Sequence, residues 1–378
     1  MINISIPNLS KLEKKYLIDC IDSNFVSAVG KYIKIFEDKF KKIEGSKFVS
    51  SVNSGTSALH LSLLASGVKK NDLVIVPSYT FAATINAILY CGAQPWFFDI
   101  SRDDFVINLD QVHNVLKKKT IIKKNKILHK KTKQTVKAIL PVFTYGLTPN
   151  LEKLNFVRKK FGLKVILDAA SGHSSSFKNQ LISKKNFLTC YSFNGNKSFT
   201  SGGGGIIATN YKKIYNEVNT LKNVGKKSFK YKYERAGFNY KLNNIQAAVG
   251  VGQIENYKKI VHSKKKIFQE YERNIPKKIK QFLFKPKKWQ TGVPWVKFLI
   301  LNSESSTRKL ITYLNNHKIE SKIFWRPLHL DKPYRNFLKE DLKISESVWK
   351  KVVILPSSSS LKLIDQKKII NVLKNFFT

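Results

Sequence analysis

Short apolar runs alternate with helix-length segments over the first two thirds of the chain, and this alternation restricts the fold more than any other feature. Residues 74–76 and 165–167 are runs of valine, isoleucine and leucine without a polar side chain. Such runs are typical of strands that are buried on both faces. Because helix-length segments separate them, they predict an α/β fold with a mainly parallel sheet covered on both sides.

The expected elements follow from these runs and from the capping and breaking residues between them. Ser10 is a candidate cap for the first helix, and Gly67 closes a later one. We expect strands at 48–52, 73–76, 95–100, 138–143, 164–167 and 206–209, and helices at 8–24, 32–42, 57–66, 80–91 and 363–377.

The domain organisation follows from length and from where the alternation loosens. A chain of 378 residues exceeds the usual size of one core. The pattern becomes irregular after Asn256. We expect a large domain at residues 1–255 and a smaller C-terminal α+β domain at 256–378.

The net charge of +43 has two interpretations, a nucleic-acid or anionic-membrane partner, or an ordinary enzyme surface rich in lysine. Arginine, whose bidentate fork suits phosphate, is scarce. The lysines run along the whole chain, without a nucleic-acid motif beside them. We favour the enzyme surface. The lysine-rich stretch 117–133 predicts an exposed basic hairpin, and we prefer a solvated excursion to a polyanion-binding arm.

We expect the protein to lie in the reducing environment of the cytoplasm. Cys20, Cys91 and Cys190 are far apart and form neither a metal-binding spacing nor a disulfide framework. No run approaches the ~18 apolar residues of a membrane span. Residues 1–15 contain no apolar signal region. We therefore expect no membrane partner and no metal.

Lys197 is the first candidate catalytic residue, because of its surroundings. It follows an apolar strand and precedes four consecutive glycines at 202–205. Glycines allow the backbone to pass close to a flat ligand, where side chains would collide. A lysine at this place can form an imine with an aldehyde cofactor.

Two further motifs stand at the ends of expected strands. Asp168 ends the strand at 164–167 and suits a cationic ring nitrogen, although a helix N-cap is a common alternative. Gly55, Thr56 and Ser57 lie between a strand and a helix, where backbone N–H groups and hydroxyls can bind a phosphate. A plain capping turn explains the same residues.

Three other features are open to two interpretations each. Phe81, at the start of a helix, can stack on a cofactor ring or lie in the core. The polar positions within 237–248 suit a site or subunit interface, or a helix start capped by Asn243 or Asn244. His329, in a proline-stiffened loop, can contact a substrate or remain a structural histidine.

Together these motifs resemble the DegT/DnrJ/StrS family of pyridoxal-phosphate sugar aminotransferases, over about residues 6–361. Each motif alone is weak, and their shared order carries the resemblance. The motifs are at 53–59, 77–84, 168–170, 192–197 and 237–240.

The resemblance implies aminotransferase fold type I and a role for each matching residue. Lys197 is the implied Schiff-base lysine and proton shuttle, Asp168 the partner of the pyridine nitrogen, and Phe81 the stacking ring. Thr56 and Ser192 are implied to bind the phosphate, with backbone help from Gly55 and Ser57. Asn239 is implied to reach that phosphate from the neighbouring subunit of a homodimer, and His329 to lie near the sugar.

The implied reaction moves the amino group of L-glutamate to a nucleotide-linked 4-keto-6-deoxy sugar, with ping-pong kinetics. Residues 193–197, 91–95 and the basic insertion look most like the subgroup acting on UDP-2-acetamido-2,6-dideoxy-4-hexulose. The alternative is a GDP-4-keto-6-deoxymannose (perosamine-type) aminotransferase. Three positions depart from the family pattern. Ser171, near the ring, stands where Gln or Glu is usual, Lys241 where Arg is frequent, and Phe143 where His is frequent.

Other classes of protein remain as alternatives. A cofactor-bound regulator without turnover is one, but Lys197 and Asp168 are both present. Similar dehydratases carry a histidine in place of the lysine, so Lys197 argues against an eliminating enzyme. A nucleic-acid-binding protein is the remaining alternative.

Overall fold

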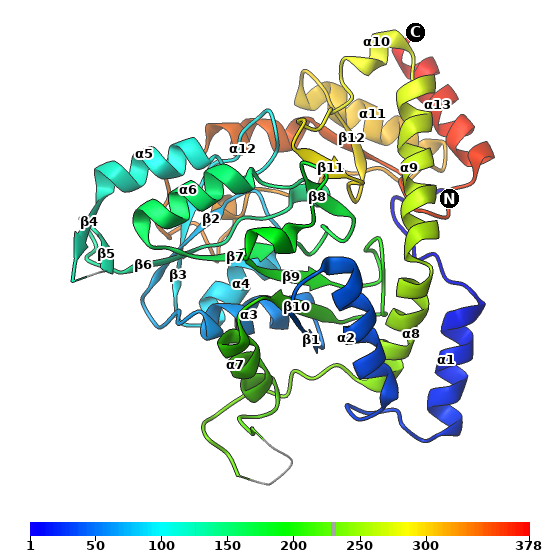
Figure 1. Ribbon diagram of the computed structural model, residues 1–378. Helices are drawn as coiled ribbons and strands as arrows, with labels where there is room; N and C mark the ends of the chain where they lie inside the picture. Colours follow the sequence, from blue (N-terminus) through cyan, green and yellow to red (C-terminus); the bar gives the residue numbers. More distant parts are fainter. Residues whose placement is uncertain (125, 228–231) are drawn as a thin grey trace.

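A seven-stranded sheet forms the centre of the molecule (Figure 1). The computed structural model describes residues 1–124, 126–227 and 232–378. The strands, in spatial order, are β1 (Phe48–Val52), β10 (Gly205–Thr209), β9 (Leu188–Ser192), β7 (Lys164–Asp168), β6 (Val136–Ile139), β2 (Leu73–Pro77) and β3 (Gln94–Phe98).

Strand direction confirms the predicted mainly parallel sheet and adds one reversal. The pairs from β9 through β3 are parallel, while β10 is antiparallel to both β1 and β9. A crossover helix is needed between parallel neighbours, and β9 reaches β10 through residues 193–204 without one. The loop that carries Lys197 and the glycines is therefore the connection that reverses the chain.

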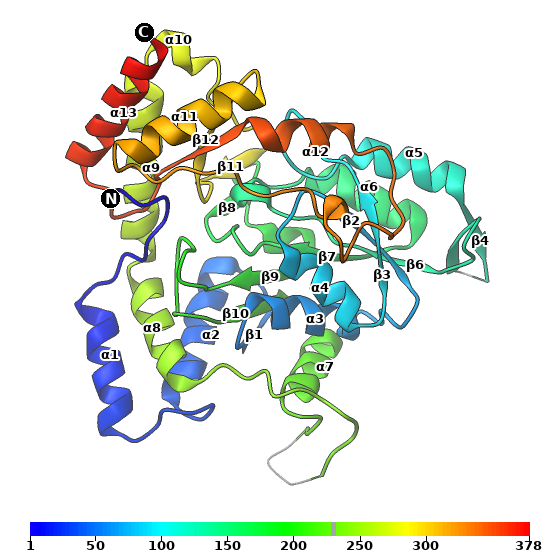
Figure 2. The same cartoon turned by 180° about the vertical axis from the view of Figure 1, so that it is seen from behind.

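Helices cover both faces of the sheet, as the apolar runs predict. On one face the core joins α2 (Lys31–Glu44), α5 (Leu109–Lys119), α6 (Leu151–Phe161) and α8 (Asn244–Glu255). On the other face it joins α3 (Gly55–Ala65), α4 (Ala82–Tyr90) and α7 (Lys212–Lys222), which Figure 2 shows from the front.

The first helix is shorter than the expected 8–24, but it begins directly after the predicted cap. Ser10 caps α1 (Lys11–Asp22) in a capping box with Glu13. The last helix, α13, spans Leu363–Phe377 as expected. The strand expected at 138–143 begins earlier and is shorter (β6), because the chain turns after Ile139 toward the 3-10 turn Thr144–Gly146.

The C-terminal region has its own core. The pair β12 (Lys297–Ile300) and β13 (Val352–Leu355) is antiparallel, and its residues pack with α9 (Tyr257–Asn274), α10 (Lys277–Lys280), α11 (Glu304–Asn316) and α13. The chain start also reaches this region, where the Ile2 N–H donates to the Lys318 carbonyl at 2.8 Å. The division at 255/256 stays a prediction, although α8 and α9 meet there.

The remaining elements are short. They are β11 (Gln290–Gly292) paired with β8 (Ser175–Phe177), α12 (Lys343–Val348), and the 3-10 turns Ile182–Lys185, Leu328–Leu330 and Trp349–Lys351.

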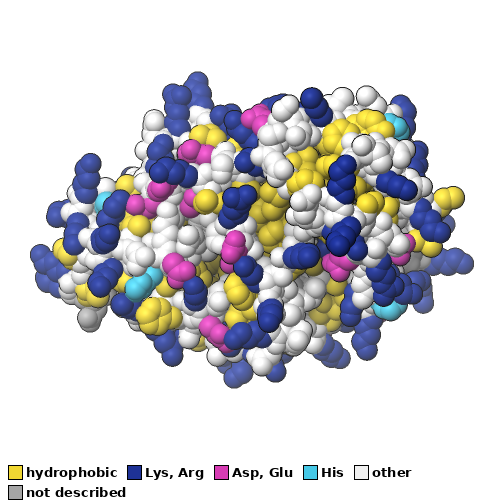
Figure 3. All heavy atoms as spheres, turned by 90° about the horizontal axis from the view of Figure 1, so that it is seen from above, with side chains coloured by type: hydrophobic (Ala, Val, Ile, Leu, Met, Phe, Trp, Pro, Cys, Tyr) yellow, Lys and Arg dark blue, Asp and Glu magenta, His cyan; other side chains and the backbone are white. Residues whose placement is uncertain are grey.

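The predicted basic hairpin is present as β4 (Thr120–Lys123) and β5 (Lys126–His129), at one end of the molecule (Figure 1). Residue 125 lies outside the described part, and residues 117–119 belong to α5. Lysine and arginine side chains are spread over the whole face seen in Figure 3. On that face, this even spread favours an ordinary lysine-rich enzyme surface over a localised site for a polyanion. Within the described ranges, no helix has the length and apolarity of a membrane span.

Candidate active site

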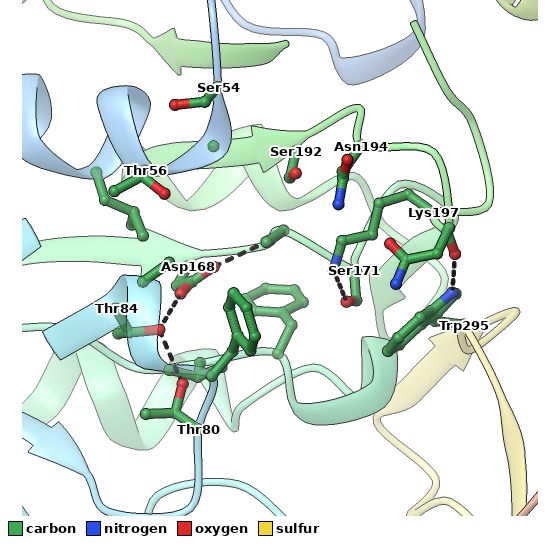
Figure 4. Close-up of a pocket in the computed structure, with 18 of the residues that line it drawn as sticks. Ser54, Thr56, Thr80, Thr84, Asp168, Ser171, Ser192, Asn194, Lys197 and Trp295 are labelled. Carbon is green, nitrogen blue, oxygen red and sulfur yellow. Dashed lines mark hydrogen bonds between the residues drawn. The ribbon is translucent and has the colours of Figure 1, made fainter. Parts of the chain in front are cut away.

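A cavity of about 420 Å³ lies at the carboxyl ends of the central strands (Figure 4). Seven of the residues predicted from the sequence line it, and side chains from the C-terminal region close one side. The predicted residues are Gly55, Thr56, Phe81, Asp168, Ser171, Ser192 and Lys197, and the closing side chains are Trp295, Lys322, Phe324 and Trp325.

Lys197 extends from the β9–β10 loop into this cavity. Its Nζ donates to Ser171 Oγ at 3.0 Å and lies 4.6 Å from the centre of the Trp295 ring. Burial lowers the pKa of the Lys197 amine to about 8, and the Asp168 carboxylate offsets part of this effect. A fraction of Lys197 is therefore uncharged, and able to react, near neutral pH.

Asp168 is the last residue of β7, and its side chain is only 4 % exposed. One carboxylate oxygen accepts from the Ala170 N–H at 3.1 Å and the other from the Thr84 hydroxyl at 2.7 Å. Burial raises the pKa of Asp168 despite these two bonds. The chain continues through turns into β8, so the N-cap interpretation of Asp168 is wrong.

The start of α3 provides the predicted anion site in part. Ser54 caps the helix by accepting from the Ser57 N–H at 3.0 Å, and the Ser57 hydroxyl donates to Asn53 Oδ1 at 2.6 Å. Ser57 thus serves the capping turn and does not line the cavity. Thr56 and Ser192 stand at the cavity (Figure 4). Hydroxyls beside a helix N-terminus are suited to a phosphate.

Gly55 is required where α3 approaches the end of β9. A Cβ built at this position would lie 2.7 Å from the Ser192 Cβ and 3.0 Å from its hydroxyl oxygen. The absent side chain therefore allows the helix start and Ser192 to share one side of the cavity.

Phe81 lies at the mouth of the cavity with 58 % of its surface exposed, so the interpretation as a core residue is wrong. Phe143, at the position where His is frequent in the family, is buried and lines the same cavity. Two phenylalanine rings in one cavity offer aromatic surface to a flat ligand.

His329 and Asn239 are not among the lining residues. His329 is buried, with Nδ1 2.6 Å from the Ser78 hydroxyl and Nε2 2.9 Å from Glu346 Oε1. Asn239 is exposed, and its carbonyl lies 3.5 Å from the Asn53 side-chain nitrogen. Their predicted contacts with a sugar and with a partner's phosphate stay predictions.

Helix capping accounts for part of the polar run at 237–248. Asn243 caps α8 by accepting from the Gln246 N–H at 2.8 Å. Asn244 is buried, and its side-chain oxygen accepts from the Tyr32 N–H at 3.0 Å. The capping interpretation therefore holds for Asn243, whereas Asn244 is the first residue of α8 and its side chain binds the start of α2.

These residues fit pyridoxal phosphate. The buried Asp168 carboxylate receives two neutral donors, and a protonated ring nitrogen would give it an opposite charge. The partly neutral Lys197 amine also faces the cavity. The hydroxyls of Thr56 and Ser192 line it beside the N-terminus of α3, where they can bind a phosphate. The acidic partner and the reactive lysine are the two groups that this cofactor needs from a protein.

Comparison with known proteins agrees with this geometry. The model of the DegT/DnrJ/EryC1/StrS aminotransferase family matches residues 7–374. The chain belongs to this family. Its relatives include the GDP-perosamine synthases of Vibrio cholerae (32 % identical, covering 100 % of this chain and 99 % of the relative) and Caulobacter vibrioides (32 %, 98 % and 97 %). Among solved structures, a DegT/DnrJ/EryC1/StrS aminotransferase from Brucella abortus matches with a TM-score of 0.87 and 25 % identity, over 97 % of this chain and 95 % of that one.

The family match confirms several expectations. The α/β aminotransferase fold, the transaminase activity on sugars and the pyridoxal phosphate cofactor are those of the DegT/DnrJ/EryC1/StrS family. The expected UDP-linked subgroup is not confirmed, since the relatives named above are GDP-perosamine synthases.

Sequence reasoning missed two kinds of residue in the site. Thr84 is the last residue of the motif at 77–84, and its hydroxyl, 2.8 Å from that of Thr80, donates to the Asp168 carboxylate. The helical spacing of Thr80 and Thr84 could have indicated this pair. Trp295, Phe324 and Trp325 lie about a hundred residues or more beyond Lys197, in a region without a recognised motif, and no local signal places them here.

Proposed function

We propose that this chain transfers the amino group of L-glutamate to the 4-keto carbon of GDP-4-keto-6-deoxymannose, giving a GDP-linked 4-amino-4,6-dideoxy sugar. The observation that supports this substrate is the pair of full-length relatives at 32 % identity that are named GDP-perosamine synthase. The family supplies the reaction type and the cavity supplies its residues.

Pyridoxal phosphate, when bound, supplies an electron-accepting ring that carries the amino group between the two substrates. Asp168 is proposed to keep the ring nitrogen protonated, because an opposite charge in a buried site favours the cationic form. Thr84 and the Ala170 N–H orient the carboxylate for this task. Thr56 and Ser192 bind the phosphate, and Phe81 packs against the ring.

Lys197 is proposed to hold the cofactor and then to move protons. Its Nζ, uncharged in part because its pKa is about 8, would accept the proton from the α-carbon of glutamate and return a proton to the aldehyde carbon of the cofactor. Ser171 orients the amine through the 3.0 Å hydrogen bond. On the return half-reaction Lys197 delivers a proton to carbon 4 of the sugar.

We further propose a homodimer in which Asn239 of one subunit completes the phosphate site of the other. Asn239 is exposed and absent from the cavity lining of its own chain, which agrees with a role outside that chain's site. A mixing experiment tests this assignment. Lys197→Ala and Asn239→Asp are each expected to be nearly inactive, the second because a carboxylate repels phosphate.

Subunits of the two variants, exchanged by brief mild denaturation, form hybrids with one intact site if Asn239 acts across the interface. Activity is then expected to reappear after exchange. If Asn239 acts within its own chain, every site keeps one lesion, and no activity returns.

The substrate is tested by a screen with L-glutamate as donor and 2-oxoglutarate release as readout. We expect turnover with GDP-4-keto-6-deoxymannose to exceed turnover with UDP-2-acetamido-2,6-dideoxy-4-hexulose by at least about a hundredfold in kcat/KM, about 3 kcal/mol of discrimination. The reverse preference contradicts the proposal. Release of no 2-oxoglutarate with any sugar favours a binding protein without turnover.

A further inference from the structure

Lys264 is a buried lysine whose hydrogen bonds go to carbonyl groups. It lies on α9 with 1 % of its surface exposed. Its Nζ donates to the Trp295 carbonyl and to the Ser357 carbonyl, each at 2.8 Å. Burial lowers the pKa of Lys264 to about 7. Lysines are almost never fully buried unless they are paired, so this arrangement calls for an explanation.

Trp295 connects Lys264 to the site. It is buried in the segment between β11 and β12, and its ring lies over the Lys197 amine, 4.6 Å from ring centre to Nζ. The ring nitrogen donates to the Asn196 carbonyl at 2.8 Å, next to Lys197 in the chain. Lys264 therefore holds the backbone of the residue whose side chain covers the reactive lysine.

We propose that Lys264 is a positioning residue that fixes Trp295 over Lys197 and thereby shields one side of the Lys197 amine from water. This role rests on the proposed function in one respect, that Lys197 must be partly uncharged to react. It goes beyond the proposed function by assigning the partial burial of Lys197 to a residue outside the cavity.

The direction of the effect follows from comparing two contributions of the Trp295 ring. The ring face attracts an ammonium, which raises the pKa of Lys197, but a desolvated contact of this kind corresponds to about 1.5 pH units. Burial acts in the opposite sense and is the larger cause, because it lowers this pKa from 10.5 to about 8. Loosening Trp295 admits water, so the pKa of Lys197 rises.

Ionisable neighbours of Lys197 must be considered in any test. Asp168 raises the pKa of Lys197, while His173, on the turn after β7, has its own pKa lowered to about 3, mainly by burial. Lys322 lines the cavity from the C-terminal region and pairs with Glu320 at 2.8 Å. These side chains stay unchanged in the variants below.

The test compares Lys264→Met with Lys265→Met, its exposed neighbour on α9. The full-length chain is freed of cofactor, and its fold is checked by circular dichroism. Reductive methylation of Lys197 is then followed by peptide mapping from pH 6 to 11. We expect the midpoint for Lys197 to rise by about one pH unit in Lys264→Met and to stay unchanged in Lys265→Met.

Two further measurements keep the proposal open to refutation. In the holoenzyme, the acid limb of the kcat pH profile is expected to shift upward in Lys264→Met, whichever sugar is the substrate. If Lys264→Met does not fold, Lys264→Gln is judged by the same midpoint. A folded variant with an unchanged Lys197 midpoint overturns the proposal, while the proposed substrate is judged separately by the sugar screen.

Discussion

The reactivity of Lys197 should depend on pH as that of an amine with a pKa of about 8. At pH 7 about 9 % of such an amine is uncharged, against about 0.03 % at a pKa of 10.5, so the reactive fraction is about 300-fold larger. The structural cause is burial beneath Trp295, offset in part by Asp168. The experiment therefore varies the pH of the cofactor-free chain.

The assay measures the rate at which pyridoxal phosphate is captured at Lys197, with Nα-acetyllysine as a reference amine in the same buffers. The ratio of the two rates cancels the titration of the aldehyde. Below pH 8 capture should rise about tenfold per pH unit, and it should level off near pH 8 while the reference rises toward its pKa of about 10.4. A capture rate at Lys197 that keeps rising to pH 10 contradicts a pKa of about 8 for this amine.

Three other changes have defined outcomes. Asp168→Asn should lower kcat by about a hundredfold or more. In the cofactor-free chain burial raises the pKa of Asp168, so the carboxyl is tolerated best when protonated, and the Asn variant freed of cofactor should be the more stable protein in urea at pH 8, with less advantage at pH 5. Gly55→Ala places a Cβ 2.7 Å from that of Ser192 and should weaken cofactor affinity by about tenfold or more in equilibrium dialysis; unchanged affinity contradicts the close approach. Burial raises the pKa of Glu44 to about 7, so its contribution to stability is complete below pH 4.5 and is lost as the pH rises through 7. The stability of Glu44→Gln relative to wild type should therefore increase by about 3 kcal/mol between pH 4.5 and 8, and a constant difference in urea unfolding contradicts this.

Much of the fold could be predicted because its signals are local. The runs at 74–76 and 165–167 have no polar face, which is typical of strands buried on both sides, and both lie in such strands. The reversal of β10 was not predicted, since strand direction depends on how residues 193–204 connect, and not on the residues of the strand itself.

The residues of the candidate site fall into the same two groups, those with a local sequence signal and those without one. Lys197, Asp168 and the start of α3 could be identified because they follow strands whose carboxyl ends meet at one edge of the sheet. Trp295 and Lys264 could not, since their contacts join segments that are distant in the sequence. His329 stands in a proline-stiffened loop, but both of its ring nitrogens are engaged by Ser78 and Glu346, and only the packed structure reveals these contacts.

Covalent attachment of the cofactor to Lys197 is tested by borohydride reduction of the purified holoenzyme, followed by peptide mapping. We expect a reduced pyridoxyl adduct on Lys197 in the wild type and its loss in Lys197→Ala. An adduct on another of the chain's many lysines, or a Lys197→Ala variant that still turns over glutamate, contradicts the assignment of Lys197.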